Sequence, residues 1–323
     1  MNDTILVVGG TGLMGGAVIE RLLQATDASL VIPTRDARSE RASKVLALSE
    51  GRVRMVEGDL SDDAHLDEVM SMADAVFCNT NFFAANSPVA EYTLGRRILD
   101  SAHTHGMKRF VYSSLDDALA LTQGAIAVPH YDGKAAVAAY INLMRSEEMM
   151  QRVEEGWFSN NVSILTTAPY FENLTSGLAP SPATLSDARE GLRFTLPFGE
   201  GAYPMISLQD IGWFTAYMFA HWQSWGSRDL AVVGDRLTGR GIAESFEKQT
   251  GIPSEYQDLP LEVIIDSIPH VGHDLAAMSA LFQARDITIQ DRDLNHLRSL
   301  HPGLMNFQQW MVTTGWRGAP VSP

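Results

Sequence analysis

Short apolar runs alternate with longer amphipathic segments along the first half of the chain. TILVV precedes the helical pattern GGAVIERLLQA, SLVIPTR precedes a polar helical segment, and VRMVEGDL and ADAVFCNT follow. This alternation predicts a parallel sheet with helices on both faces. The runs are apolar throughout, as expected of strands covered on both sides. KRFVYSSL and NVSILTTAP read as the next two strands, so we predict a doubly wound α/β fold.

The pattern loosens after residue 169, where the Pro-, Ser- and Gly-rich stretch FENLTSGLAPSPATLSDAREG predicts a loop or a lid over a site. A strand-like run, DLAVVGD, precedes Thr238, which we expect to cap a short helix. The remaining residues read as mostly helical. The predicted division is a first domain over 1–169, joined by 205–237, and a smaller subdomain over 170–204 and 238–323.

The composition is that of a soluble globular protein. Of 323 residues, 45% are hydrophobic and 20% are charged, and the formal net charge of −15 argues against direct nucleic-acid binding. The single cysteine, Cys78, reads as a small buried residue, and the start MNDTILVV lacks a secretory pattern, so we expect a cytoplasmic protein. IGWFTAYMFA is half the ~20 residues that span a bilayer, which favours a buried helix and no membrane contact.

Three glycines, Gly9, Gly12 and Gly15, lie between the first strand and the helix that follows. In this context they predict a dinucleotide-binding turn. The first permits a positive φ, the second lets the backbone approach a pyrophosphate, and the third lets helix and strand pack closely. The helix N-terminus then offers N–H groups to the phosphates. A tight turn without a ligand is the alternative.

The end of the second strand bears on the choice of cofactor. An acidic residue there would hold the ribose 2′-OH of NAD, whereas Arg35 offers a planar cation suited to a 2′-phosphate. We therefore predict NADP(H). Asp36 keeps NAD as the alternative, and the other interpretation of Arg35 is a solvated charge. Arg38 and Lys44 are candidates to assist Arg35, with solvated helix charges as the preferred interpretation.

Polar side chains also follow the third, fourth and fifth strands. Asp59 is expected to accept a hydrogen bond from an adenine amino group or to cap a helix. Residues 79–81 are placed for ribose or phosphate contacts, with turn formation as the alternative. Ser113 and Ser114 are expected to contact substrate or to form a turn.

His130 and Lys134 stand four residues apart in PHYDGKAAVAAYI, which reads as the start of a helix. That spacing places both side chains on one helical face. His130 is a candidate proton donor, and its alternative role is to cap the helix or fix the loop. Lys134 is expected to hold the cofactor ribose. Tyr131 and Tyr170 are alternative sources of a hydroxyl.

The ordered motifs GGTGLMG, TRD, GDL, NTN, SSL and HYDGKAAVAAY resemble an atypical short-chain dehydrogenase of the NmrA-like family. PYFENL, DLAAMSALFQ and FQQWM are similar to its NADPH-sensing, redox-responsive branch. The resemblance covers nearly the full length and implies a Rossmann domain, NADP(H) preference and a smaller C-terminal subdomain beside the nicotinamide. By motif it implies that Gly9, Gly12 and Gly15 hold pyrophosphate, Arg35 the 2′-phosphate and Lys134 the ribose and nicotinamide side, with residues 170–173 lining the cleft.

Two features depart from the family pattern. The extra length over 143–161 is expected to extend a helix or form an interface, and its Met and Trp residues are read as core in preference to a partner surface. An Arg common before the cleft motif in relatives is replaced by Thr166 or Thr167. In short-chain dehydrogenases a Tyr takes the place of His130.

The resemblance leaves the activity open, because some relatives reduce quinones, imines or activated alkenes and others are sensors that bind protein partners. Our first hypothesis is an NADPH-dependent reductase of a small electrophilic substrate held under residues 170–204. The second is a non-catalytic NADPH sensor of a protein partner, and the third is a structural Rossmann protein. A homodimer is considered, and no metal site is expected because the histidine pairs lack acidic or Cys companions at ligand spacing.

The candidate catalytic residues are His130, Lys134 and Tyr170. The candidate cofactor-binding residues are Gly9, Thr11, Gly12, Leu13, Met14, Gly15, Arg35, Asp59, Leu60, Asn79, Thr80, Asn81, Ser113, Lys134, Tyr170, Phe171 and Asn173.

Overall fold

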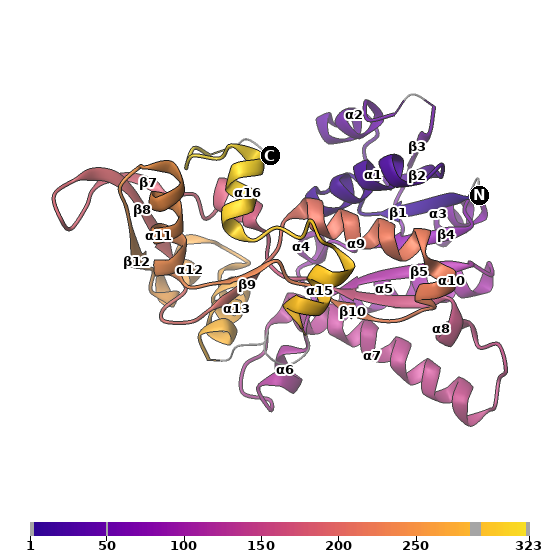
Figure 1. The fold of residues 1–323 in the computed structure, drawn as a ribbon. Helices are drawn as coiled ribbons and strands as arrows, with labels where there is room; N and C mark the ends of the chain where they lie inside the picture. The colour runs from indigo at the N-terminus through magenta and orange to yellow at the C-terminus, as the bar shows by residue number, and fades with distance from the viewer. Residues whose placement is uncertain (1–2, 50, 285–291, 321–323) are drawn as a thin grey trace. The chain divides into compact units, whose positions relative to one another are not determined.

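The computed structural model describes residues 3–49, 51–284 and 292–320 (Figure 1). The chain divides into two compact units. The first comprises residues 1–117, 129–166 and 211–230, and the second comprises residues 118–128, 167–210 and 231–323.

The first unit is built on a seven-stranded sheet with the order β10-β6-β5-β4-β1-β2-β3. The strands are β1 (Thr4–Val8), β2 (Ser29–Thr34), β3 (Val53–Glu57), β4 (Ala75–Cys78), β5 (Arg109–Ser114), β6 (Val162–Thr166) and β10 (Leu230–Ala231). The neighbouring pairs from β6 to β3 run parallel. The chain winds outward in both directions from β1 and β4, and such a switch point opens a crevice at the C-terminal ends of the strands. The predicted doubly wound fold is confirmed.

Helices cover both faces of this sheet. They are α1 (Leu13–Ala25), α2 (Glu40–Leu46), α3 (Asp63–Ser71), α4 (Phe82–Ala85), α5 (Pro88–Thr104), α7 (Pro129–Met150), α8 (Trp157–Asn160), α9 (Leu208–Ala220) and α10 (Trp222–Trp225). α5 and α7 lie side by side on one face, and α1 and α9 lie on the other (Figure 1). α9, which contains IGWFTAYMFA, is buried along most of its length, as predicted. Among the helices that the structure describes, none has the length and apolar character needed to cross a membrane.

The extra segment over 143–161 extends α7 to Met150 and then forms α8. Trp157 packs against the core and donates from Nε1 to the carbonyl of Met107 at 2.7 Å. Met149 and Met150 are instead 71% and 73% exposed. Trp157 is therefore part of the core, as predicted, whereas the two methionines at the end of α7 are not.

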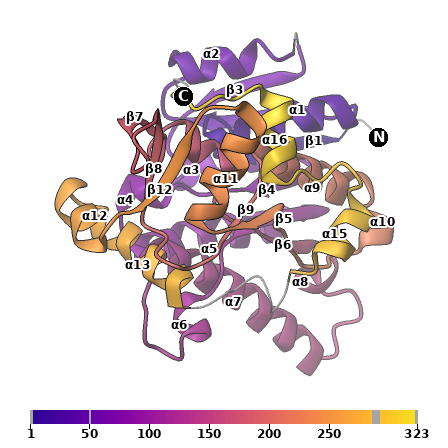
Figure 2. The same cartoon turned by 60° about the vertical axis from the view of Figure 1, so that its left-hand side comes forward.

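The second unit contains two small sheets and several helices (Figure 2). The strand orders are β12-β8-β7 and β11-β9, formed by β7 (Ser181–Thr184), β8 (Glu190–Leu196), β9 (Tyr203–Met205), β11 (Asp235–Leu237) and β12 (Ser254–Asp258). The helices are α6 (Ala118–Leu121), the 3-10 helix η1 (Phe171–Thr175), α11 (Gly239–Thr250), α12 (Leu261–Ser267), α13 (Gly272–Ala284), α15 (Leu294–Leu300) and α16 (Phe307–Thr314). Thr238 caps α11 as predicted, its side chain accepting from Gly241 N.

The Pro-, Ser- and Gly-rich stretch predicted as a loop is ordered into η1 and the antiparallel pair of β7 and β8. A tight turn joins the strands, with Leu185 N donating to Arg189 O at 2.8 Å and Ala188 at φ = +64°. The guanidinium of Arg193 on β8 then binds the carbonyl of Thr184 at 2.9 Å. Pairing between strands thus overrides the local turn-forming composition.

Candidate functional site

The turn between β1 and α1 lies against the residue that follows β4. Gly9 has φ = +78°, a left-handed conformation that glycine adopts without steric cost. A Cβ on Gly9 would lie 2.2 Å from the carbonyl oxygen of Asn79. Gly12 N closes the turn by donating to Gly9 O at 2.9 Å. Backbone conformation and close approach together require glycine at position 9.

The N-terminus of α1 is open toward an anion. Gly12 occupies the N-cap position and brings no side chain, and the first turn of the helix contains no acidic residue. Gly15 packs beneath the turn, where a Cβ would lie 2.1 Å from Gly9 O. Main-chain N–H groups and the positive end of the helix dipole favour negative charge. The turn therefore fits a pyrophosphate.

Arg35 and Asp36, which follow β2, are both exposed. The carboxylate of Asp36 accepts from Arg38 N at 2.9 Å and so takes part in its own turn. Hydrogen bonds from Ser61, and further the positive charge of Arg35, lower the pKa of Asp59. Arg35 thus adds positive potential where β2 and β3 end.

Asp59 does not cap α3, so that interpretation is wrong. Asp62 is the N-cap, and its side chain accepts from Ala64 N at 2.9 Å. Asp59 instead accepts from Ser61 N at 2.8 Å in the turn before the helix. Leu60 is partly buried against the core. The contact of Asp59 with adenine stays a prediction.

Lys134 lies on α7, and its side chain is buried beside the turn that follows β4. Its Nζ donates to Thr80 O at 2.8 Å, Thr80 Oγ1 at 3.1 Å and Glu91 Oε1 at 2.8 Å, with Asn79 Oδ1 at 3.4 Å. The Thr80 hydroxyl also donates to Glu91 Oε1. Lys134 and Glu91 are only 7% and 3% exposed. A contact of Lys134 with a ribose stays a prediction, and it requires one of these bonds to be exchanged.

Glu91 was missed by the sequence analysis. It lies on α5 with Gly95, Ile98, Leu99 and Ala102, which are all buried. This spacing marks one face of a helix. A carboxylate on an otherwise apolar face needs a partner when it is buried, and that position is the signal that points to it.

His130 is the second residue of α7, and its side chain is 8% exposed. Its ring lies 4.7 Å from the Tyr131 ring, 5.5 Å from Phe83 and 5.9 Å from Phe82, measured between centroids. The predicted helix brings His130 and Lys134 into the same buried part of the first unit. Phe83 itself is 48% exposed.

Ser113, at the end of β5, donates from Oγ to Met14 Sδ at 3.3 Å and so contacts the glycine turn. Ser114 donates to the carbonyl of Leu115 at 3.1 Å. Asn81 precedes α4 and is exposed. Cys78 is fully buried, as predicted, and burial raises the pKa of its thiol to about 12.

Tyr170, Phe171 and Asn173 belong to the second unit. Tyr170 forms a β-bridge with Ile206, and burial, aided by the charge of Glu172, raises the pKa of its hydroxyl. The Phe171 side chain is fully buried, with its ring 5.6 Å from that of Trp310. Asn173 accepts through its carbonyl from Leu178 N at 3.0 Å. Phe171 is therefore a core residue of its unit, and a cofactor contact for these three residues stays a prediction.

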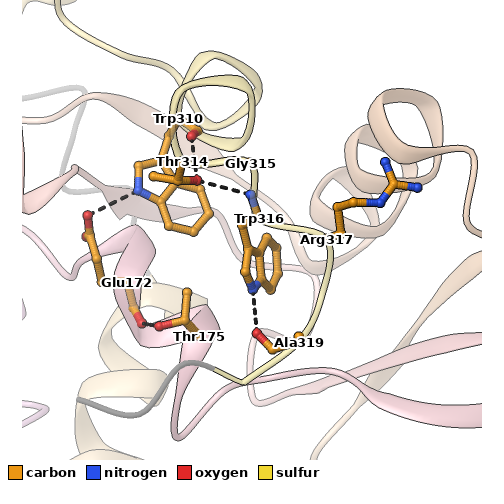
Figure 3. A pocket seen from close by; sticks show the side chains of 8 residues that line it. All are labelled: Glu172, Thr175, Trp310, Thr314, Gly315, Trp316, Arg317 and Ala319. Atoms are coloured by element: carbon orange, nitrogen blue, oxygen red, sulfur yellow. Dashed lines mark hydrogen bonds between the residues drawn. The ribbon is translucent and has the colours of Figure 1, made fainter.

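Glu172 is among the residues that line a pocket in the second unit (Figure 3). It is lined by Glu172, Thr175, Trp310, Thr314, Gly315, Trp316, Arg317 and Ala319. The Glu172 carboxylate accepts from Trp310 Nε1 at 3.1 Å and from Leu208 N at 3.2 Å. Burial raises the pKa of the Glu172 carboxyl from its ordinary value of 4.5. Between the ordinary and the raised pKa, the folded protein therefore binds a proton that the unfolded chain has released. Its contribution to stability is therefore greatest at low pH and declines as pH rises through the folded-state pKa.

These features define a class. A doubly wound sheet whose glycine turn lies at the switch point, before an open helix N-terminus, is typical of dinucleotide-binding domains. The NmrA-like family model matches residues 1–311. The chain belongs to the NmrA-like family, which confirms the resemblance seen in its motifs.

The proteins that this chain is similar to include oxidoreductases and a transcriptional regulator. The NmrA-like family domain-containing oxidoreductase lnaB of Aspergillus flavus is 27% identical over 79% of this chain and 75% of its own. The negative transcriptional regulator Nmra, solved with NAD, has a TM-score of 0.75 at 18% identity and covers 96% of this chain and 94% of its own. The triphenylmethane reductase of Citrobacter sp., solved with NADP(H), has a TM-score of 0.71 at 15% identity, and the match covers 96% of this chain and 99% of the reductase.

Proposed function

We propose that this chain is an NADPH-dependent reductase of a small electrophilic substrate of the quinone, enone or imine class. The observation that carries the proposal is the glycine turn, because its form and the open N-terminus of α1 suit a pyrophosphate. Arg35 provides the cation that a 2′-phosphate needs. The oxidoreductase of Aspergillus flavus and the reductase solved with NADP(H) support the same function.

The bound NADPH would supply a hydride from its nicotinamide ring. The chain's own residues bind and orient it. In the proposal, the turn from Gly9 to Gly15 holds the pyrophosphate and Arg35 the 2′-phosphate. Asp59 and Leu60 lie on the adenine side, and residues 79–81 with Ser113 lie on the side of the nicotinamide ribose.

His130 is the proposed proton donor to the reduced substrate. Its surroundings of aromatic rings exclude water from one side, and a neutral or charged imidazole can donate a hydrogen bond from nitrogen. Tyr170 is the alternative donor, because a tyrosine hydroxyl is protonated at neutral pH and can donate a hydrogen bond. In the proposal, Lys134 orients the turn after β4 through its bonds to Thr80 and Glu91.

The test follows NADPH oxidation with a panel of quinones, enones and imines. His130→Ala should lower kcat by about 10²- to 10⁴-fold while NADPH affinity stays within about twofold of the wild type. Tyr170→Phe is the matched comparison for the alternative donor. Turnover that survives His130→Ala and is lost in Tyr170→Phe would transfer the role to Tyr170.

The second candidate function is a non-catalytic NADPH sensor that regulates a protein partner. It is favoured by the likeness to Nmra, which is described as a negative transcriptional regulator. Tight NADPH binding without turnover of any panel member would support the sensor. Location in the cytoplasm and assembly as a homodimer remain part of the proposal for either function.

A further inference from the structure

Glu91 and Lys134 form a buried ion pair across two helices of the first unit. Lys134 Nζ lies 2.8 Å from Glu91 Oε1, and the side chains are 9% and 2% exposed, respectively. Two charges buried so deeply are retained only when hydrogen bonds satisfy both. The position of this pair beside the glycine turn gives it a role beyond holding the helices together.

Gly133 allows α5 to come close enough for this contact. A Cβ at Gly133 would lie 3.1 Å from the Cα of Pro88 and 3.2 Å from the Cβ of Glu91. Both distances are tighter than most Cβ contacts, so a larger residue would push the first turn of α5 away from α7. The glycine of the HYDGK motif therefore serves the approach of Glu91 to Lys134.

The ammonium of Lys134 donates to the turn after β4 and to Glu91. Thr80 receives two bonds, at its carbonyl and its hydroxyl, Glu91 receives another, and Asn79 Oδ1 lies 3.4 Å from the nitrogen. The preceding residue, Asn79, places its backbone carbonyl against Gly9, and its backbone N–H donates to Val8 O at 3.3 Å. A continuous series of contacts thus runs from Glu91 through Lys134 and Thr80 to the glycine turn.

We propose that Glu91 is a positioning residue of the cofactor site. It holds the Lys134 ammonium against Thr80, and this fixes the turn over residues 79–81 against Gly9 in the form that receives the dinucleotide. The inference rests on the proposed function only for the identity of the ligand. The direct-contact hypothesis for Lys134 makes the opposite prediction, because loss of Glu91 would release a cation beside an anionic cofactor and strengthen binding.

The experiment compares NADPH affinity in the full-length wild type, Glu91→Gln and Asp100→Asn. Asp100 is the control because it is another carboxylate of α5 bonded to α7, accepting from Tyr140 Oη at 3.0 Å. It is 43% exposed, pairs with Arg96 and takes no part in the contacts described for Lys134. Glu91→Gln should weaken NADPH binding at least about tenfold, and Asp100→Asn should change it less than about twofold. Unchanged or tighter binding by Glu91→Gln overturns the proposal.

The double variant Glu91→Gln/Lys134→Met separates positioning from folding. It leaves no uncompensated buried charge, so its Tm should recover toward the wild type even where Glu91→Gln alone fails to fold. Its NADPH affinity should remain at least about tenfold weak because the turn has lost its anchor. Recovery of affinity together with Tm would show that Glu91 acts through stability alone and would overturn the proposal.

Hydrogen exchange in the absence of cofactor distinguishes this inference from the proposed function. In the double variant the backbone amides of Asn79 and Gly12, which donate to Val8 O and Gly9 O, should exchange at least about tenfold faster than in the wild type, whereas those of β5 should not change. Faster exchange supports the positioning of the glycine turn by Glu91 even if the wild type binds no NADPH. The absence of NADPH binding would instead reject the proposed function. Unchanged exchange in the turn overturns the inference and leaves the proposed function standing.

Discussion

Replacing Gly15 with Ala tests the geometry of the glycine turn. The new Cβ would lie 2.1 Å from Gly9 O and 2.6 Å from the Cα of Gly10, and both are backbone atoms with no freedom to rotate away. Overpacking of this kind costs roughly 1–3 kcal/mol. Gly16 is the matched control, since a Cβ there meets nothing within 4 Å. At such an open helical position, alanine stabilises by roughly 0.5–1 kcal/mol relative to glycine.

Both residues lie in α1, so the helical gain applies to both variants, and their free energies of unfolding should differ by the overpacking cost of roughly 1–3 kcal/mol in urea titrations. Relief of the clash displaces the Gly9 carbonyl, so Gly15→Ala should also weaken NADPH binding by about tenfold or more in calorimetry. Gly16→Ala should keep the wild-type affinity. Equal stability and equal affinity in the two variants would refute the close packing of Gly15 beneath the turn.

Three further predictions concern buried groups. Cys78 should react with a thiol-specific disulfide reagent only after denaturation, because burial raises its pKa to about 12, and rapid reaction of the native protein would contradict this. Glu172→Gln should flatten the decline of the unfolding free energy as pH rises above 4.5, and an unchanged slope above that pH would exclude a raised pKa for Glu172. Asp210→Ala should lower the unfolding free energy by roughly 1–3 kcal/mol, because it removes the buried carboxylate that lies 2.8 Å from His301 Nε2 and 3.2 Å from Met305 N, and a wild-type Tm would argue against those contacts.

Apolar runs were sufficient to predict most of the central sheet, and the glycines between the first strand and helix predicted the turn. β3 is the exception among the strands, since it contains Arg54 and Glu57 and is only partly buried. The two signals are mostly local, because Gly15 is required by the backbone of Gly9 and Gly10. Thr238 was predicted for the same reason, since a cap acts within one turn of its helix.

Features that depend on contacts between distant segments were missed or wrongly interpreted. Glu91 reads as an ordinary helical acid until α5 packs beside α7 and meets Lys134, 43 residues later in the sequence. The stretch before Glu190 reads as a loop until it pairs with β8. Asp59 was expected to cap a helix, but α3 begins only after Asp62, which takes that role. In each case the deciding interaction lies outside the local sequence window.

The central claim, an NADP(H) site in which Arg35 receives the 2′-phosphate, is tested most directly by calorimetric titration with NADPH and with NADH. We predict that the wild type binds NADPH at least about tenfold more tightly than NADH. Arg35→Ala should abolish this difference without changing NADH affinity, and Arg41→Ala, which removes an exposed cation of α2, should preserve it. Equal affinity of the wild type for the two dinucleotides, or binding of neither, would contradict the claim.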